Sequence, residues 1–373
     1  MRKHKLLTVG VWLLLLQAGW AQKYSNEFLS LGIGAKAQAM GNSTVASVDD
    51  VTAAYWNPAA LAGMDIASGM EIGAMHAEWF AGIGKFDYLG VAMPLAKGKR
   101  AIGITAIRFG IDDIPNTLNL FDNDGSINFD NVVPFSSADY AFMGSYAQQI
   151  FTHLGKLYVG GNVKVVHRTI GQFAKAWGFG IDASVQWRHK HWNFGLMARD
   201  ISNTFNSWTF NFTEDEKKIL EATSNLVPSS SLEVTRPQFI FATAYHHQWN
   251  KFGLLAELNA NVSLDGKRNT LFRSNPYSLD PTLGLEVNYG KFVFLRAGIN
   301  NLQQEEDLNG NDEWRYQPNL GLGLKFINLR IDYALTDVGQ QDQKTYSHVV
   351  SVILRLDFNY LKKAVKNANK QGN

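Results

Sequence analysis

The chain has 373 residues, a formal net charge of +2 at pH 7, 18% charged residues and 12% aromatic residues. This small net charge does not provide the basic surface that nucleic acids bind, so we expect no nucleic-acid partner. The absence of cysteine excludes disulfides, thiolate metal sites and cysteine nucleophiles. A mean hydropathy of -0.16 argues against a bundle of membrane helices, each of which needs about 20 apolar residues.

The first 21 residues have the pattern of a secretory signal peptide. Three basic residues precede an apolar run from Leu6 to Leu16, and Gly19-Trp20-Ala21 follows at the spacing of a cleavage site. The run is too short to cross a membrane as a helix. We therefore expect export, with a mature chain that begins at Gln22.

Residues 22–66 are rich in small side chains with helical spacing. Around Asn57-Pro58-Ala59 the sequence predicts a one-turn helix, with Asn57 as N-cap, Pro58 as the first helical residue and Gly63 just past the end. A large barrel leaves room in its lumen. We expect this segment to plug the lumen of the barrel predicted below.

From residue 67 onward the apolar residues recur with a period of two, which is typical of strands with one apolar and one polar face. One such face contains Trp177, Phe179, Ile181, Ala183, Val185 and Trp187. Many of these segments have ten to fourteen residues, which is long for a soluble strand and suits a tilted membrane strand. Aromatic residues at the strand ends resemble an interfacial girdle: Trp177, Trp187, Trp192, Tyr289, Phe326, Tyr333 and Phe358.

The pattern predicts fourteen strands, an even number as bacterial barrels require. They cover residues 67–77, 85–94, 101–109, 138–151, 156–169, 175–188, 191–199, 237–249, 251–264, 280–289, 291–300, 316–326, 328–336 and 346–358. The even-numbered connections between these strands are all short. Every long connection is odd-numbered. With the N-terminus in the periplasm, all long loops face the cell surface. The sequence thus predicts an all-β fold, a 14-stranded antiparallel transmembrane barrel spanning residues 67–358.

A resemblance to a known family lies in the segment before the barrel. The run from Phe28 to Met64, FLSLGIGAKAQAMGNSTVASVDDVTAAYWNPAALAGM, resembles the N-terminal signature of the PorV/PorQ family, which is related to the FadL-type outer-membrane transporters. The resemblance implies a fourteen-stranded barrel with a plugged lumen. It also implies a place in the type IX secretion system of Bacteroidota, where such barrels bind exported cargo or translocon and attachment subunits. FadL relatives instead pass long-chain fatty acids and other hydrophobic molecules.

Charged residues of both signs lie on the polar faces of the predicted strands. In a barrel they point into the lumen, where we expect neighbouring strands to pair them into a ladder that holds the plug. The ladder residues are Glu257, Glu286, Arg296, Lys325, Arg330, Asp332 and Arg355; Lys164, Arg168, Asp182 and Asp357 share these faces. No nucleophile with a matched acid and base stands out, so we expect neither an enzyme nor a cofactor.

Metal sites are not expected either. His246 and His247 are adjacent on one strand and face opposite sides, so they cannot chelate one ion together. Two predicted loops have calcium-like clusters, one from Asp122 to Ser126 and one from Asp307 to Glu313. Asp307, Asn309 and Asn311 in the second place oxygens at alternate positions, but neither loop has the full twelve-residue calcium-binding pattern. Turn chemistry explains both loops without a metal. Asp307, Asn309 and Asn311 are the only candidates for one.

The last fifteen residues, 359–373, form a basic tail that we expect to be a solvated periplasmic extension rather than a contact surface. Our first functional hypothesis is a non-enzymatic barrel of the type IX secretion system that binds secreted cargo, translocon or attachment partners in the outer membrane. The alternative is a FadL-like channel for long-chain fatty acids or other hydrophobic molecules. A purely structural or adhesin-anchoring barrel is a third possibility.

Overall fold

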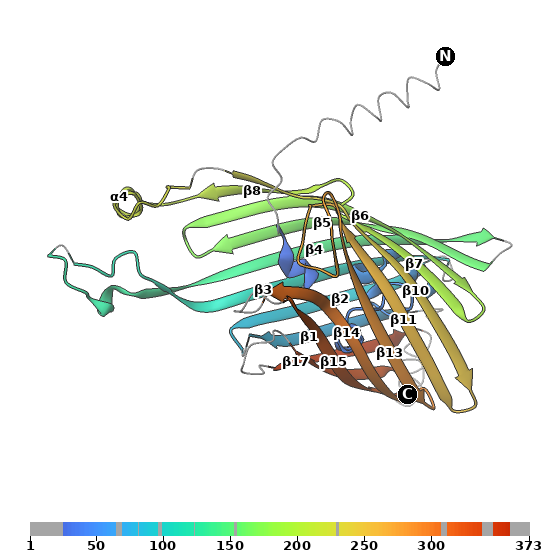
Figure 1. The fold of residues 1–373 in the computed structure, drawn as a ribbon. Coiled ribbons are helices and arrows are strands. Elements are labelled where there is room, and N and C mark those ends of the chain that lie inside the picture. The colour runs from blue at the N-terminus through green and yellow to red at the C-terminus, as the bar shows by residue number, and fades with distance from the viewer. Residues whose placement is uncertain are drawn as a thin grey trace, which may run out of the picture.

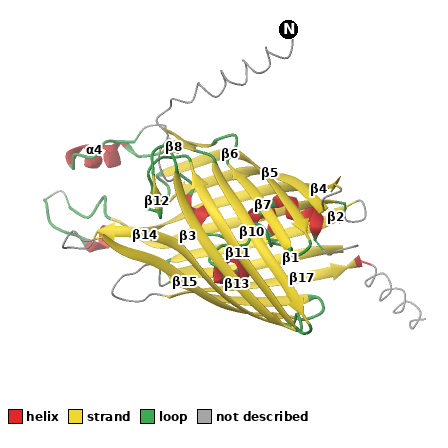
Figure 2. Cartoon of the chain, turned by 45° about the vertical axis from the view of Figure 1, so that its right-hand side comes forward, coloured by secondary structure: helices red, strands yellow, loops and turns green. Residues whose placement is uncertain are grey.

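The computed structural model describes residues 25–64, 69–80, 82–95, 99–122, 124–152, 155–228, 231–306, 312–337 and 346–358. The predicted signal peptide, the basic tail and the candidate metal ligands Asp307, Asn309 and Asn311 lie outside these residues. Among the described residues, no helix is long and apolar enough to cross a membrane. Strands dominate the fold and enclose a short helical segment (Figures 1 and 2).

Fourteen long strands form a closed antiparallel barrel, and all fourteen predicted strands are confirmed. Each strand pairs with its neighbours in the barrel, and β1 pairs with β17 from Gly69 opposite Asp357 to Glu78 opposite His348, which closes the wall. The strands are β1 (Gly69–Trp79), β2 (Gly84–Leu95), β3 (Arg100–Asn116), β4 (Val133–Thr152), β5 (Gly155–Ile170), β6 (Ala174–His189), β7 (Trp192–Arg199), β10 (Gln238–Trp249), β11 (Phe252–Ser263), β13 (Ser278–Tyr289), β14 (Val293–Glu306), β15 (Asp312–Lys325), β16 (Leu329–Asp337) and β17 (Tyr346–Asp357).

The connections differ in length at the two ends of the barrel. At one end, called the turn end here, β10 joins β11, β13 joins β14 and β15 joins β16 through two or three residues each. The opposite end, called the loop end, carries the long connections, including the one between β7 and β10. The alternation of short and long connections follows the predicted order.

The β7–β10 connection contains structure that the sequence analysis treated as loop. It forms β8 (Thr204–Phe210), α4 (Glu214–Ala222) and β9 (Ser231–Thr235); smaller elements in other loops are η4 (Phe129–Asn131) and β12 (Phe272–Arg273). Strand β8 pairs with the loop-end half of β6, while β7 pairs with the other half. The wall therefore continues beyond β7, which is a short strand. Helix α4 begins with a capping box between Thr213 and Glu216, a sequence signal that could have predicted it.

Apolar side chains cover the outside of the barrel. Large hydrophobic residues such as Ile104, Leu295 and Leu320 are exposed there, on strands whose alternate residues face the lumen. Aromatic side chains are exposed near the strand ends, including Trp177 at 57% and Tyr289 at 49%. An apolar band flanked by aromatic rings is the exterior that a lipid bilayer requires.

Residues 25–64 form a plug inside the barrel. Its helical pieces are η1 (Glu27–Ser30), α2 (Ala35–Ala39), α3 (Ala53–Trp56) and η2 (Pro58–Gly63). The plug begins at the loop end, where Ser25 contacts Glu233 of β9, and it leads into β1, which starts at the turn end. Its small side chains let the short helices and turns pack closely, so almost the whole segment is buried. The first described residues therefore lie at the loop end, although β1 itself starts at the turn end.

Candidate functional site: the plugged lumen

Glycines in the wall let the plug approach the strands closely. A Cβ added to Gly298 would lie 2.1 Å from the carbonyl carbon of Met40, and one added to Gly160 would lie 2.6 Å from the backbone nitrogen of Ala59. Neither strand could hold a larger residue there without moving the plug. The backbone of the plug thus packs directly against the backbone of the wall.

Asn57 ties two parts of the plug to the barrel. This fully buried side chain donates from Nδ2 to the carbonyl oxygens of Val45 at 2.8 Å and Val185 of β6 at 3.3 Å. Asn57 occupies the N-cap position, as predicted, but its side chain makes no capping bond, and the turn is a 3-10 helix that includes Gly63. Pro58 is its first residue, and the Ala59 N–H donates to Ser184 Oγ at 2.9 Å.

Two wall carboxylates accept hydrogen bonds from the backbone of the plug. Glu257 accepts from the N–H groups of Ala46 at 2.7 Å and Ser47 at 3.0 Å. Glu71 accepts from the Val51 N–H at 3.0 Å and is paired with Arg355 at 2.6 Å. Each buried carboxyl group thus satisfies backbone donors of the plug that would otherwise lack a partner. These hydrogen bonds fix the middle of the plug to opposite parts of the wall.

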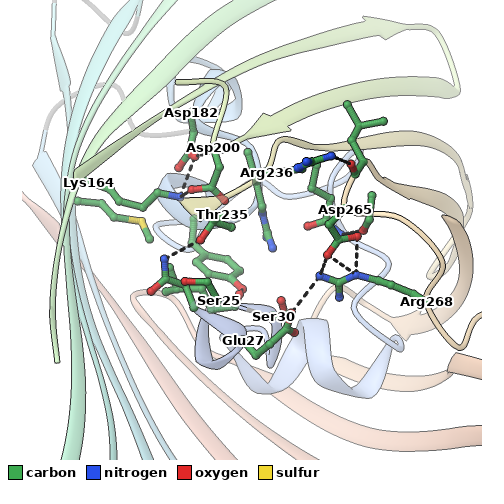
Figure 3. A pocket seen from close by; sticks show the side chains of 18 residues that line it. Ser25, Glu27, Ser30, Lys164, Asp182, Asp200, Thr235, Arg236, Asp265 and Arg268 are labelled. Carbon is green, nitrogen blue, oxygen red and sulfur yellow. Dashed lines mark hydrogen bonds and ion pairs between the residues drawn. The ribbon is translucent and has the colours of Figure 1, made fainter. Parts of the chain in front are cut away.

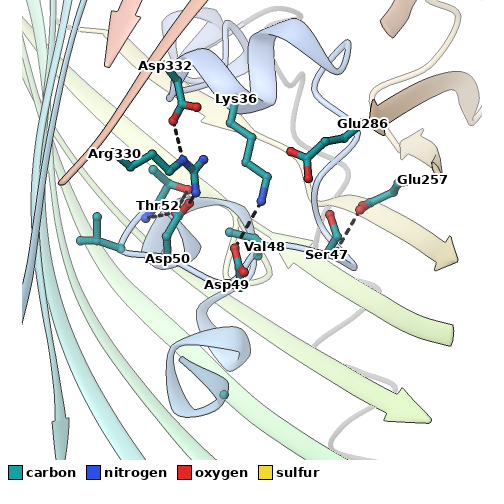
Figure 4. A network of polar contacts seen from close by, with 12 residues as sticks. Lys36, Ser47, Val48, Asp49, Asp50, Thr52, Glu257, Glu286, Arg330 and Asp332 are labelled. Atoms are coloured by element: carbon teal, nitrogen blue, oxygen red, sulfur yellow. Dashed lines mark hydrogen bonds and ion pairs between the residues drawn. The ribbon is translucent and has the colours of Figure 1, made fainter. Parts of the chain in front are cut away.

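An ion-pair chain runs along the lumen side of β13, β14 and β16, and Figure 4 shows its part around Arg330, between Asp332 and Asp50. Arg296 contacts Glu286 at 2.6 Å and Asp332 at 2.7 Å, and Asp332 contacts Arg330 at 2.6 Å. Arg330 also reaches Asp50 of the plug at 3.0 Å. Of the predicted ladder residues, Glu286, Arg296, Arg330 and Asp332 form this chain, Glu257 contacts the plug, and Arg355 pairs with Glu71 of the wall.

Lys325 lies apart from this chain. Its side chain is exposed at the turn end and makes no ion pair with another described residue. Its position at the last residue of β15 explains this, because the strand leaves the lumen there. Glu71 and Asp50 were not among the predicted ladder residues. Glu71 lies on the polar face of the first predicted strand, so the sequence could have identified it as a ladder residue. Asp50 lies in the plug, where no strand periodicity shows which side chains face the wall.

Within the plug, Lys36 contacts Asp49 at 3.2 Å. Burial alone would lower the pKa of Lys36, but the nearby carboxylates of Asp49 and Glu286 outweigh it and raise the pKa above its ordinary value. The side chain of Asp49 is 60% exposed, and Lys36 and Arg330 hold the pKa of its carboxyl below its usual range. Both groups are thus charged at neutral pH.

A cavity of about 480 Å³ lies at the loop end, above the plug. Its walls come from the plug, from β10, β11 and β13 to β15, and from the loop around Arg268. A smaller cavity of about 50 Å³ adjoins it and shares several lining residues (Figure 3). There Lys164 contacts Asp182 at 2.9 Å and Asp200 at 2.6 Å, and Arg268 contacts Asp265 and Glu27.

A third cavity, of about 30 Å³, lies at the turn end and is lined by Asp49, Glu71, Lys325, Arg330 and Arg355 among others. The plug lies between this cavity and the larger one. The described lumen is therefore wide at the loop end, filled by the plug in the middle, and has only a small cavity at the turn end.

The other predicted positions have structural explanations. Asp122 accepts hydrogen bonds from Asn128 and Asn131, and Asp124 accepts from Ser126, so turn contacts occupy this loop. Arg168 pairs with Asp139 and with Glu233. No group of three or more potential metal ligands occurs among the described residues.

No protein-family model matches the sequence, and no curated protein is similar to it in sequence. Solved structures do match its fold. The toluene transporter TodX of P. putida aligns over 87% of this chain and 99% of its own, with a TM-score of 0.52 and 12% identity. The CymD monoaromatic hydrocarbon channel covers 88% and 98%, with a TM-score of 0.51 and 12% identity.

A FadL homologue of Pseudomonas aeruginosa aligns over 91% of this chain and 100% of its own, with a TM-score of 0.49 and 14% identity. At such identities the similarity concerns the fold alone. The chain therefore shares its overall fold with the TodX and CymD structures. The resemblance to PorV/PorQ finds no counterpart among these neighbours.

Proposed function

We propose that the chain is a non-enzymatic uptake channel of the outer membrane, in which the N-terminal plug closes the lumen and moves to let small molecules pass. The observation that carries this proposal is the arrangement of the cavities. A cavity of about 480 Å³ opens at the loop end, a smaller one opens at the turn end, and the plug alone separates them. A volume of this size is typical of sites for small molecules.

Two kinds of contact hold the plug in the lumen. Apolar side chains of the plug, such as Leu61, share one buried core with wall residues such as Ile107. Polar contacts lie at separate points, such as the ion pair of Arg330 with Asp50. The polar contacts can be exchanged for water when the plug shifts, so a moving plug has mainly to give up its apolar packing.

The exterior of the barrel supports a location in the outer membrane, because an apolar band with aromatic ends surrounds a polar interior. We place the long loops at the cell surface, so the larger cavity faces the outside. The solved neighbours are named as a toluene transporter and a monoaromatic hydrocarbon channel. Small hydrophobic molecules are therefore among the first substrates to test.

The type IX secretion hypothesis is less well supported. It depended on the N-terminal signature, and neither comparison by sequence matched a family. The signature segment has a role in the barrel that needs no secretion partner, since it fills the lumen and contacts the wall. We therefore favour the channel over a barrel that binds secreted cargo or attachment subunits.

Uptake tests this proposal. The chain is produced in a Gram-negative host that lacks its own channels for fatty acids, hydrocarbons and sugars, and entry of labelled oleate, toluene and glucose is measured. We expect entry of at least one solute to exceed that in cells without the chain. Unchanged entry of all three, together with recovery of secretion-machinery subunits in a pull-down from outer membranes, would contradict the channel and favour the secretion role.

A further inference from the structure

We propose that the loop-end cavity binds a neutral molecule rich in hydroxyl groups, such as a mono- or disaccharide, rather than a bare hydrocarbon. This inference rests on the proposed channel function and narrows its substrate class. It comes from the chemistry of the side chains that line the cavity, which differs from the lining that a hydrocarbon would need.

Carboxamides and hydroxyls dominate the lining. Of the 22 lining residues, nine are Asn or Gln and five are Ser or Thr. Only four are apolar, and three of these, Trp56, Trp79 and Ile240, are each just 3% exposed. Gln38, Ser263, Ser278 and Thr282 are buried as well, so the side chains available to a ligand are mainly amides, which come from both the plug and the wall.

A hydrocarbon in this cavity would separate these groups from water without giving them a new partner. Burying an amide or hydroxyl without a hydrogen bond is unfavourable, and a site built from such groups rejects ligands that cannot bond to them. A saccharide replaces the lost water contacts, because each of its hydroxyls both donates and accepts. The lining therefore selects for hydroxyl groups.

The charges that line the cavity are balanced, which favours a neutral ligand. Arg199 and Arg268 supply two cations, and Glu27 and Asp280 supply two carboxylates. Arg268 is already held by Glu27 at 3.0 Å and by Asp265 at 2.5 Å. No excess of either sign is left to attract an ionic ligand.

The lining combines amide side chains of the plug with those of the wall. Gln38 and Asn42 come from the plug, whereas Asn261 and Gln317 come from wall strands. Each carboxamide offers both a donor and an acceptor, as a hydroxyl does. Asn42 belongs to the plug, so a ligand bound here touches the segment that closes the lumen.

Calorimetry with the purified full chain in detergent tests the inference. The probes are glucose, maltose, sucrose and N-acetylglucosamine, with octanoate and toluene as apolar comparisons. Asn261→Leu and Gln317→Met each remove one lining amide whose side chain makes no hydrogen bond to another described residue. Asn288→Leu is the matched control, because Asn288 lies on the lumen face of β13 near the turn end and does not line the cavity.

We expect at least one saccharide to bind at millimolar concentration or below. Each lining substitution should weaken its binding about threefold to tenfold, which is the loss of one neutral hydrogen bond, and the control should not change it. Binding of octanoate or toluene alone, tightened by the lining substitutions, would overturn the inference while leaving the channel intact. Binding of no probe would overturn it too, and the uptake assay then shows whether the channel function also fails.

Discussion

The carboxylate of Glu257, on the barrel wall, accepts the backbone N–H of Ala46, in the plug, at 2.7 Å. The two residues are 211 positions apart in the sequence, and the wall residue is only 1% exposed. The same carboxylate holds the next N–H of the plug, that of Ser47. One wall side chain thus fixes a turn of the plug that has few backbone bonds of its own, which makes this contact a suitable place to loosen the plug.

Replacing Glu257 by Gln should make the plug more mobile without unfolding the barrel. The amide keeps the shape but has one acceptor oxygen in place of two, so one of the two plug N–H groups loses its acceptor. We expect the amides of Ala46 and Ser47 to exchange with deuterium about tenfold faster, which corresponds to about 1.4 kcal/mol. Glu78→Gln, on the exterior, is the control and should leave exchange unchanged. Equal exchange in both variants would rule out this anchor.

The ion pair between Arg330 and Asp50 can be tested with a double-mutant cycle. Arg330→Met leaves two carboxylates, Asp50 and Asp332, without this partner, and removal of one member of a buried pair is expected to destabilise by about 3–5 kcal/mol. Adding Asp50→Leu should recover part of that loss. Unfolding in denaturant measures the free energies.

Lys325→Met is the control for this cycle, because Lys325 makes no ion pair with another described residue, and its effect should be small. If the losses from Arg330→Met and Asp50→Leu simply add, the two residues do not interact energetically, and the plug is held by other contacts.

Because the plug packs closely on the wall, alanine substitutions at two wall glycines should have different effects on stability. Gly298→Ala places a methyl group against the backbone of Met40 and Gly41, whereas the corresponding atom at Gly144 meets nothing within 4 Å. We expect Gly298→Ala to destabilise the protein by about 1–3 kcal/mol and to expose the plug to protease. Gly144→Ala should do neither. Equal stability of the two variants would mean that the plug backbone does not pack on β14.

Asn57 should be sensitive to loss of its amide. Asn57→Ala leaves the buried carbonyl of Val45 without this donor, and an unsatisfied buried acceptor is expected to destabilise by about 1–3 kcal/mol. A lower melting temperature, with faster deuterium exchange in residues 44–60, is the expected result. Asn128→Ala, in an exposed loop, serves as the control. Unchanged melting of Asn57→Ala would show that the Val45 contact is dispensable.

Much of this fold could be predicted because successive side chains of a wall strand face the lipid and the lumen in turn. The sequence therefore alternates between apolar and polar residues. The run from Trp177 to Trp187 shows this directly, and its strand lies within one residue of the predicted bounds at each end. Strands β8 and β9 were missed because they extend past β7 and carry no long alternating pattern. The contacts of Glu257 with Ala46 and of Arg330 with Asp50 could not be paired from sequence, since the plug has no period that shows which side chains meet the wall.

The loop-end cavity was beyond sequence analysis for a related reason. Its lining combines plug residues such as Asn42 with wall residues such as Asn261 and Gln317, which are distant in the chain. Asn and Gln are also common on any lumen face, so their gathering at one place becomes visible only when the strands are in register. The sequence predicted a plugged lumen but not the polar cavity above the plug.

The most direct test of the account is to tie the plug to the wall. A Cβ built on Gly103 of β3 lies 3.5 Å from Cβ of Ala54 in the plug, a distance suited to a disulfide, and the chain has no other cysteine. The variant Ala54→Cys with Gly103→Cys is produced in the uptake host, and entry of the transported solute is measured before and after reduction. We predict that the oxidised protein blocks entry and that reduction restores it. Equal entry in both states would contradict a channel that the plug opens and closes.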